Sequence, residues 1–111
     1  MDIFPTFCDY AGVPAPKDIR GVSLRNSPDR THVISELRYA DESREGRMLA
    51  TSRFKYVVFN DGEHREQLFD LEADPGETFN LARTPGYAAR LDEHRRLLKD
   101  WISRTGDDFK G

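Results

Sequence analysis

The chain has 111 residues, of which 33% are charged and 37% hydrophobic, and its net charge at pH 7 is −3. This length suits a single domain, and no apolar run approaches the ~20 residues of a membrane-spanning helix. The 17 basic and 20 acidic residues are scattered along the sequence, whereas a nucleic-acid-binding domain typically carries a basic surplus, so we expect neither a membrane nor a nucleic acid as a partner.

Residues 2–11 predict a short helix. They lack the basic and apolar regions of a secretory signal, so we expect a soluble chain without a signal peptide and assign no compartment. Asp2 can cap the helix, Pro5 lies in its first turn, where a missing N–H is harmless, and Gly12 can end it. Cys8 cannot form an intramolecular disulfide, because it is the only cysteine, and we expect a buried small hydrophobic residue.

The predicted helix carries a large apolar stripe for its length. Four side chains recur at helical spacing on one face: Ile3, Phe4, Phe7 and Tyr10. If the chain's own core does not cover this stripe, we expect a homodimer to form through the helix.

The middle of the chain predicts an extended connector followed by a sheet. Residues 12–30 hold three prolines and two glycines, which disfavour regular structure. Four later segments have the composition and alternation of strands, namely 31–38, 47–52, 54–59 and 67–71. Polar residues 41–46 predict a loop, and Asp61-Gly62 predicts a hairpin turn. Residues 74–77, with Pro75 before Gly76, predict a turn in which Gly76 takes a positive φ.

A helical pattern follows from Pro85 to about Thr105, with Thr84 as its cap and Gly106 as its stop. Its apolar stripe is formed by Tyr87, Leu91, His94, Leu98 and Trp101. The charged side chains between them predict a solvated face with local ion pairs. His94 is therefore expected to be a hydrogen-bonded core or boundary histidine, and residues 107–111 a solvated tail.

These elements predict an α+β fold, a small four-stranded antiparallel sheet with a long C-terminal helix packed on one face. A short N-terminal helix and the extended connector precede it. The sequence has no internal repeat.

Candidate binding residues come from the strands and their ends. Arg38, Arg47, Arg53 and Lys55 are cations that the sheet could present to one side, where guanidinium groups would suit a sulfated ligand. The alternative is an ordinary solvent-facing side. His32, at a strand start, is a further candidate for a substrate site. No histidine pair has metal-ligand spacing, and no phosphate-binding glycine loop or nucleophile elbow occurs.

Residues 66–82 carry the most specific signal. The run Leu-Phe-Asp-Leu, followed by Asp-Pro-Gly-Glu and then Asn-Leu-Ala, resembles the C-terminal subdomain of the type I sulfatases, alkaline-phosphatase-like hydrolases with a formylglycine nucleophile. Three other segments resemble the family in the same order. Residues 2–13 resemble the helix that closes the large N-terminal domain, 21–24 the connector, and 53–59 a central strand of the C-terminal sheet. The resemblance thus divides the chain into a remnant and connector, 1–27, and the C-terminal α+β subdomain, 28–111.

Sulfatases hydrolyse sulfate esters, and the resemblance implies where the chemistry resides. Formylglycine arises from a Cys or Ser followed by Pro two residues later and Arg two after that. Cys8 is followed by Asp-Tyr-Ala-Gly and does not match. The nucleophile, the Ca²⁺ ligands and the pocket lysine and histidine belong to an N-terminal domain that would precede Met1. We therefore expect no catalytic residue, metal or cofactor in this chain, and no sulfatase activity from it alone.

Two function classes stay open. In the first, the missing N-terminal domain is the partner, and this chain supports it and shapes the substrate rim. In the second, the chain is a free-standing, noncatalytic module that binds a protein or a sulfated glycan. The apolar stripe discriminates between them, because an independent domain would bury it in its own core.

Overall fold

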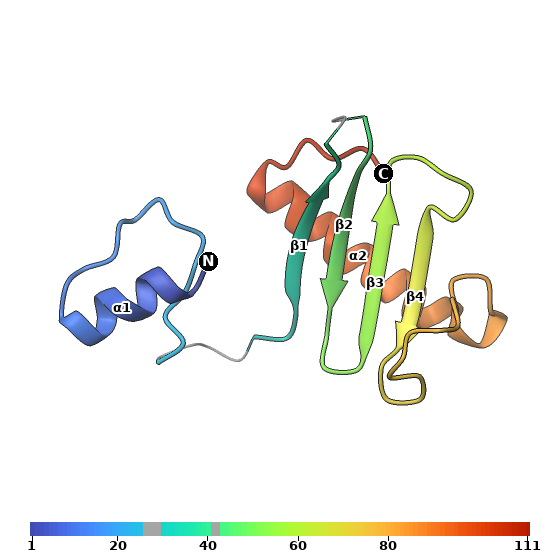
Figure 1. Ribbon diagram of the computed structural model, residues 1–111, viewed down its shortest axis with the longest axis horizontal. Helices are drawn as coiled ribbons and strands as arrows, with labels where there is room; N and C mark the ends of the chain where they lie inside the picture. Colours follow the sequence, from blue (N-terminus) through green and yellow to red (C-terminus); the bar gives the residue numbers. More distant parts are fainter. Residues whose placement is uncertain (26–29, 41–42) are drawn as a thin grey trace. The chain divides into compact units, whose positions relative to one another are not determined.

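The computed structural model describes residues 1–25, 30–40 and 43–111 and divides into two compact units, Met1–Arg30 and Thr31–Gly111 (Figure 1). The expected boundary between residues 27 and 28 lies outside the described residues. So do residues 41 and 42 of the expected loop.

The first unit contains the predicted N-terminal helix, α1, Ile3–Ala11. It ends at Gly12, which is left-handed with φ 67°. Asp2 has helical backbone angles, and its side chain makes no capping hydrogen bond. The expected cap is therefore wrong. The Asp2 carboxylate instead accepts a hydrogen bond from the Val22 amide, at 3.0 Å, and pairs with Arg30.

The connector runs back along α1. The Leu24 amide donates to the Thr6 hydroxyl at 2.9 Å, and the Ser23 hydroxyl donates to the Asp9 carboxylate at 2.7 Å. Gly21 allows this close approach, since a Cβ there would lie 2.1 Å from the Met1 carbonyl oxygen. Cys8 is half-buried rather than buried.

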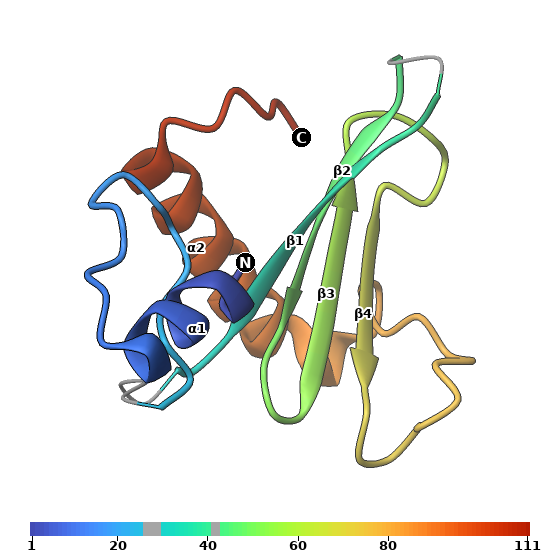
Figure 2. The same cartoon turned by 60° about the vertical axis from the view of Figure 1, so that its left-hand side comes forward.

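The second unit is the predicted α+β domain. Strands β1, Val33–Arg38, β2, Glu45–Ala50, β3, Phe54–Phe59, and β4, Glu66–Asp70, form one antiparallel sheet in that order. Helix α2, Ala88–Thr105, crosses one face of the sheet (Figures 1 and 2). The predicted fold class is confirmed. A 3₁₀ turn, Pro85–Tyr87, precedes α2, and the Thr84 side chain before it makes no capping hydrogen bond, so the expected cap is wrong.

The core lies between the sheet and α2. Alternation along the strands directs one set of side chains toward the helix, and the register places Leu49, Tyr56 and Leu68 side by side. The buried cluster consists of Leu49, Phe54, Tyr56, Val58, Leu68, Leu91, Leu98 and Phe109. His94, only 2% exposed, lies among these residues, and its Nδ1 is 2.7 Å from the Arg90 carbonyl oxygen. The expected core histidine is confirmed.

The opposite side of the sheet, which we call the open face, is not covered by α2 (Figure 2). By strand alternation it carries Val33, Leu37, Met48, Lys55, Val57, Phe59 and Phe69. Among the described residues, no helix is long and apolar enough to cross a membrane.

Candidate functional site

The five residues expected to contact a sulfated ligand lie on different faces and ends of the sheet. Arg47 faces α2, whereas Lys55 lies on the open face. Arg53 precedes β3, at the end of the sheet opposite to Arg38. His32 precedes β1, is half-buried, and has Nδ1 2.9 Å from the Thr31 hydroxyl. The structure therefore does not bring the five residues together into one pocket.

Arg47 is fully buried and bonds to the C-terminal segment. Its Nε and Nη2 donate to the two carboxylate oxygens of Asp107, each at 2.6 Å. Its guanidinium lies 4.7 Å from the centre of the Phe109 ring. The hydrogen bond to Asp107 raises the pKa of Arg47. Because a buried guanidinium needs a paired carboxylate, Asp107 and Phe109 are held against the domain, and the expected solvated tail is wrong for these two residues.

Arg53 and Lys55 also have carboxylate partners. Arg53 is half exposed and bonds to buried Asp70, with Nη2 and Oδ2 2.8 Å apart. This bond, with two backbone amides that donate to the same carboxylate, lowers the pKa of Asp70 to about 2. The Lys55 ammonium lies 2.6 Å from the Glu77 carboxylate. Arg53 thus ties the start of β3 to the end of β4, and Lys55 ties β3 to the segment that follows β4.

Arg38 is the most accessible of the predicted cations, with 63% of its side chain exposed. Its guanidinium lies 4.0 Å from Glu45 and 3.8 Å from Asp108. Contact of any of the five predicted residues with a substrate stays a prediction.

The turn that resembles the sulfatase motif is closed by Asp74. Its carboxylate accepts hydrogen bonds from the amides of Thr78 and Phe79, at 2.8 and 2.9 Å, and from the Thr78 hydroxyl. These bonds lower the pKa of Asp74. The residue with positive φ is Glu77, at 54°, and not Gly76 as expected. The left-handed residue, Glu77, thus directly precedes the two residues whose amides donate to the Asp74 carboxylate.

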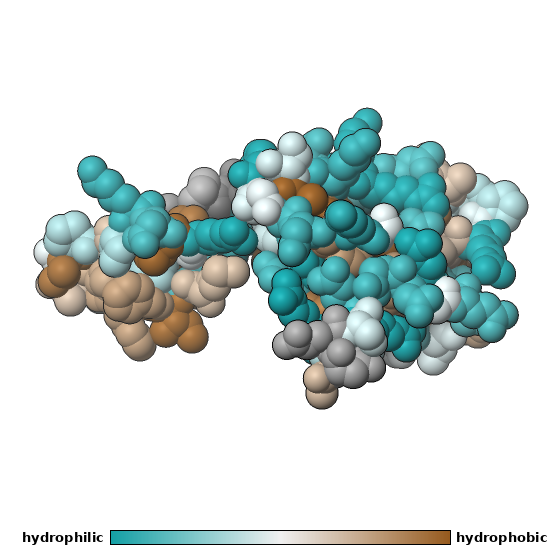
Figure 3. Space-filling view, turned by 90° about the horizontal axis from the view of Figure 1, so that it is seen from above, coloured by the Kyte–Doolittle hydropathy of each residue, from teal (hydrophilic) through white to brown (hydrophobic). Residues whose placement is uncertain are grey.

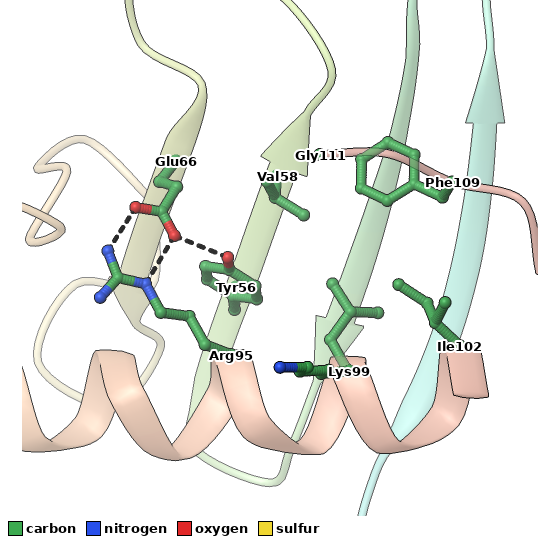
Figure 4. Close-up of a pocket in the computed structure, with 9 residues that line it drawn as sticks. Tyr56, Val58, Glu66, Arg95, Lys99, Ile102, Phe109 and Gly111 are labelled. Atoms are coloured by element: carbon green, nitrogen blue, oxygen red, sulfur yellow. Dashed lines mark hydrogen bonds and ion pairs between the residues drawn. The ribbon is translucent and has the colours of Figure 1, made fainter. Parts of the chain in front are cut away.

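A charged network that the sequence analysis did not identify lies between β4 and α2 (Figure 4). The Arg95 guanidinium bonds to both oxygens of Glu66, at 2.7 and 2.5 Å, and the Tyr56 hydroxyl donates to the same carboxylate at 2.8 Å. Arg95 lowers the pKa of Glu66, and burial raises that of Tyr56. The three residues line a cavity of about 420 Å³, whose apolar wall includes Leu98 and Phe109.

The described residues do not fit a sulfatase metal centre. Across residues 1–25, 30–40 and 43–111, no three His, Cys, Asp or Glu side chains come together as a metal site. We therefore derive no step of sulfate hydrolysis from this chain's residues.

The apolar stripe of α1 is exposed. Ile3, Phe4, Phe7 and Tyr10 keep between 55% and 71% of their surface accessible. Apolar side chains accordingly appear on the surface of the first unit (Figure 3). The connector packs on the other side of α1, where Pro5 is buried. The first unit by itself therefore does not cover the stripe.

Comparison with known proteins gives a consistent set of relatives. The family described as "N-sulphoglucosamine sulphohydrolase, C-terminal" matches residues 1–103. The chain is 38% identical to the delta 4,5-hexuronate-2-O-sulfatase of Bacteroides thetaiotaomicron, over 99% of this chain and 24% of that enzyme. It is 36% identical to an arylsulfatase of Clostridium perfringens, over 87% of the chain and 21% of that enzyme. Arylsulfatase K of Homo sapiens is 32% identical over 84% of the chain and 20% of its own length.

Solved structures show the same relationship. A 2-O GAG sulfatase matches with a TM-score of 0.87 and 39% identity, covering 96% of this chain and 25% of that one. The phosphonate monoester hydrolase of Agrobacterium radiobacter, with a TM-score of 0.75 and 24% identity over 93% of this chain and 24% of its own, shares the fold. The chain thus spans about a quarter of the length of the relatives it matches.

Proposed function

Since this chain belongs to the family of N-sulphoglucosamine sulphohydrolase C-terminal domains, we propose that it is the noncatalytic C-terminal subdomain of a sulfuric ester hydrolase. In this role it packs against the catalytic N-terminal domain and forms part of the rim of the substrate site. The formylglycine and Ca²⁺ of the reaction then belong to the catalytic domain. A 2-O-sulfated hexuronate is the first substrate to test, because a relative with 38% identity is named for that activity.

The exposed stripe of α1 carries the proposal. Its four large side chains stay accessible in the first unit, although the guanidinium of Arg25 in the connector lies over the Tyr10 ring. Burying a large apolar side chain contributes about 1.5–3 kcal/mol, so a matching surface on the catalytic domain would bind the stripe firmly. The open face of the sheet, which α2 leaves uncovered, is a second apolar surface.

A free-standing binding module is less well supported. An independent domain would bury the stripe, whereas the first unit leaves its four side chains accessible. The rim role would fall to the more accessible of the predicted cations, Arg38 and Arg53.

A chimera tests the proposal. The chain would replace the matching quarter of the Bacteroides thetaiotaomicron enzyme, and turnover of an unsaturated 2-O-sulfated hexuronate disaccharide would be measured. We expect an active chimera, and no turnover of 4-nitrophenyl sulfate by the chain alone, with or without Ca²⁺. In the chimera, Phe7→Lys should strongly reduce the yield of active enzyme. Ala89→Lys, which adds the same charge at an exposed position of α2, should not.

Two results would count against the subdomain role. One is Ca²⁺-dependent turnover by the isolated chain. The other is a chimera in which Phe7→Lys and Ala89→Lys behave alike.

A further inference from the structure

Two surface hollows of the second unit share His64 and Arg83 in their walls. Their volumes are about 380 and about 300 Å³. The first is also lined by Arg65 and the second by Gln67 and Asn80. We call the two hollows together the His64–Arg83 groove. Volumes near 300 Å³ lie at the small end of ligand sites, which suits a group the size of one sugar ring.

The backbone around the groove is fixed by Asn80. Its side-chain amide donates to the Glu66 carbonyl at 3.1 Å, and its Oδ1 accepts from the amides of Leu68 and Ala82, at 3.1 and 3.0 Å. The Leu81 amide donates to the Leu68 carbonyl at 2.8 Å. Residues 80–83 therefore run beside the edge strand β4, and Arg83 is held near the β3–β4 turn. A site framed by such bonds is preorganised for a ligand.

Two arginines in the groove, Arg65 and Arg83, have guanidinium groups available to bind an anion. Arg65 and Arg83 are exposed and bond to neutral carbonyl oxygens, of Phe59 at 3.3 Å and of Glu63 at 3.5 Å. In the part of the chain that the structure describes, neither has a carboxylate within ion-pair distance. Glu66, which also lines the groove, is neutralised by its two hydrogen bonds to Arg95. Exposed Glu63 and Gly111, the last residue of the chain, also line the first hollow, and Glu63 brings a carboxylate that opposes the two arginines.

We propose that the His64–Arg83 groove binds an oxyanion carried by a sugar, either a sulfate ester or a uronate carboxylate. The planar guanidinium fork matches both groups with paired N–H donors. Arg83 stands between the two hollows and is the principal anion-binding residue, with Arg65 beside it in the first hollow. Gln67 offers an amide to a sugar hydroxyl in the second. That the anion is part of a saccharide rests on the proposed function.

The test is a titration of the 111-residue chain followed by NMR of its backbone amides. The probes are inorganic sulfate, an unsaturated 2-O-sulfated hexuronate disaccharide, and the same disaccharide without its sulfate. We expect amide shifts confined to residues 63–67 and 80–83, with the disaccharides binding more tightly than inorganic sulfate. Tighter binding of the sulfated disaccharide identifies the sulfate ester as the recognised group, and equal binding identifies the carboxylate.

A pair of variants distinguishes binding at the His64–Arg83 groove from general electrostatic attraction to the chain. Arg83→Gln should weaken disaccharide binding about 3–10-fold, because solvent screening at an exposed site reduces a charged hydrogen bond to about the strength of a neutral one. Arg96→Gln, an equal charge change at an exposed position of α2 outside the groove, should leave binding unchanged. Unperturbed amides around the groove, or equal weakening by both variants, would overturn the proposal.

This titration requires no catalysis, so its outcome is independent of the chimera experiment. Absent binding contradicts the groove and leaves the subdomain role standing. An inactive chimera with intact groove binding contradicts the subdomain role alone.

Discussion

Arg47 and Asp107 lie 60 residues apart in the sequence and are joined by two hydrogen bonds of 2.6 Å. Arg47 comes from β2, in the centre of the sheet, and Asp107 follows the end of α2. Phe109 packs against the same guanidinium and is itself buried. This ion pair fixes the chain beyond Gly106 onto the domain and completes one side of its core.

Removing the carboxylate should therefore destabilise the domain strongly. We expect Asp107→Ala to lower the free energy of unfolding by about 3 kcal/mol, because it leaves a buried guanidinium without its partner. Urea unfolding followed by circular dichroism measures the change.

The neighbouring aspartate provides the control for this prediction. Asp108 is 82% exposed and 3.8 Å from Arg38, so Asp108→Ala should change the free energy of unfolding by less than about 0.5 kcal/mol. Adding Arg47→Met to Asp107→Ala should recover part of the loss, since the unpaired charge is then gone. Similar losses for Asp107→Ala and Asp108→Ala would show that the pair does not hold the segment.

The sheet and its helix could be predicted because their signals are local. Phe54, Tyr56 and Val58 alternate with residues of the other face, and this period is visible within six residues. The turn at Gly62 and the helix stop at Gly106 likewise depend on one residue's backbone freedom, and both have positive φ.

The long-range ion pairs could not be predicted in this way. Asp107 follows Gly106 in a polar segment, and nothing near it indicates a buried arginine 60 residues earlier. Arg95 has Asp92 as a local partner, which favours a solvated helix face, but its two-oxygen partner Glu66 is 29 residues away. Only the three-dimensional packing of β4 against α2 brings these groups together.

The bond between Arg53 and Asp70 predicts a loss of stability in acid. The folded-state pKa of Asp70 is about 2, below its ordinary value of 3.8. The stabilisation is therefore fully present above about pH 4 and is lost as the pH falls toward 2. We expect Asp70→Asn to lower stability at pH 7 and to reduce the slope of stability against pH between 4 and 2.

Urea unfolding midpoints at pH 7, 4, 3 and 2 measure this slope. Arg53→Met removes the main cause of the lowered pKa and should flatten the same interval. Parallel pH profiles for the parent chain and Asp70→Asn would refute the assignment.

His94 predicts a stabilising substitution. Its Nδ1 bonds to the Arg90 carbonyl, while its Nε2 is buried with no hydrogen-bond partner among the described residues. A buried polar group without a partner costs about 1–3 kcal/mol. We expect His94→Leu to raise the free energy of unfolding by about 1 kcal/mol, because leucine suits the apolar surroundings of Phe54 and Leu98.

A smaller side chain at the same position separates the gain from removing the unpaired nitrogen from the cost of leaving a cavity. His94→Ala also removes the unpaired nitrogen but leaves a cavity, and it should lower the free energy of unfolding by about 2 kcal/mol. Thermal unfolding of both variants gives the comparison. A His94→Leu variant as unstable as His94→Ala would mean that Nε2 has a partner in solution.

The stripe on α1 predicts self-association when the chain is studied alone. Phe4 and Phe7 are 55% and 67% exposed on a helix whose other side is already packed, and apolar patches of this kind are removed from water by association. We expect light scattering to report a homodimer at high protein concentration. The double variant Phe4→Lys with Phe7→Lys should be monomeric, because it places charge in the contact.

The control variant carries its two added lysines on α2 instead of α1. Ala88→Lys with Ala89→Lys adds the same two charges at exposed positions of α2 and should leave the dimer intact. If both double variants dissociate, general charge repulsion rather than the stripe controls association. A parent chain that stays monomeric throughout would show that the stripe alone does not drive dimerisation and that its burial requires a differently shaped surface, such as that of the proposed catalytic domain.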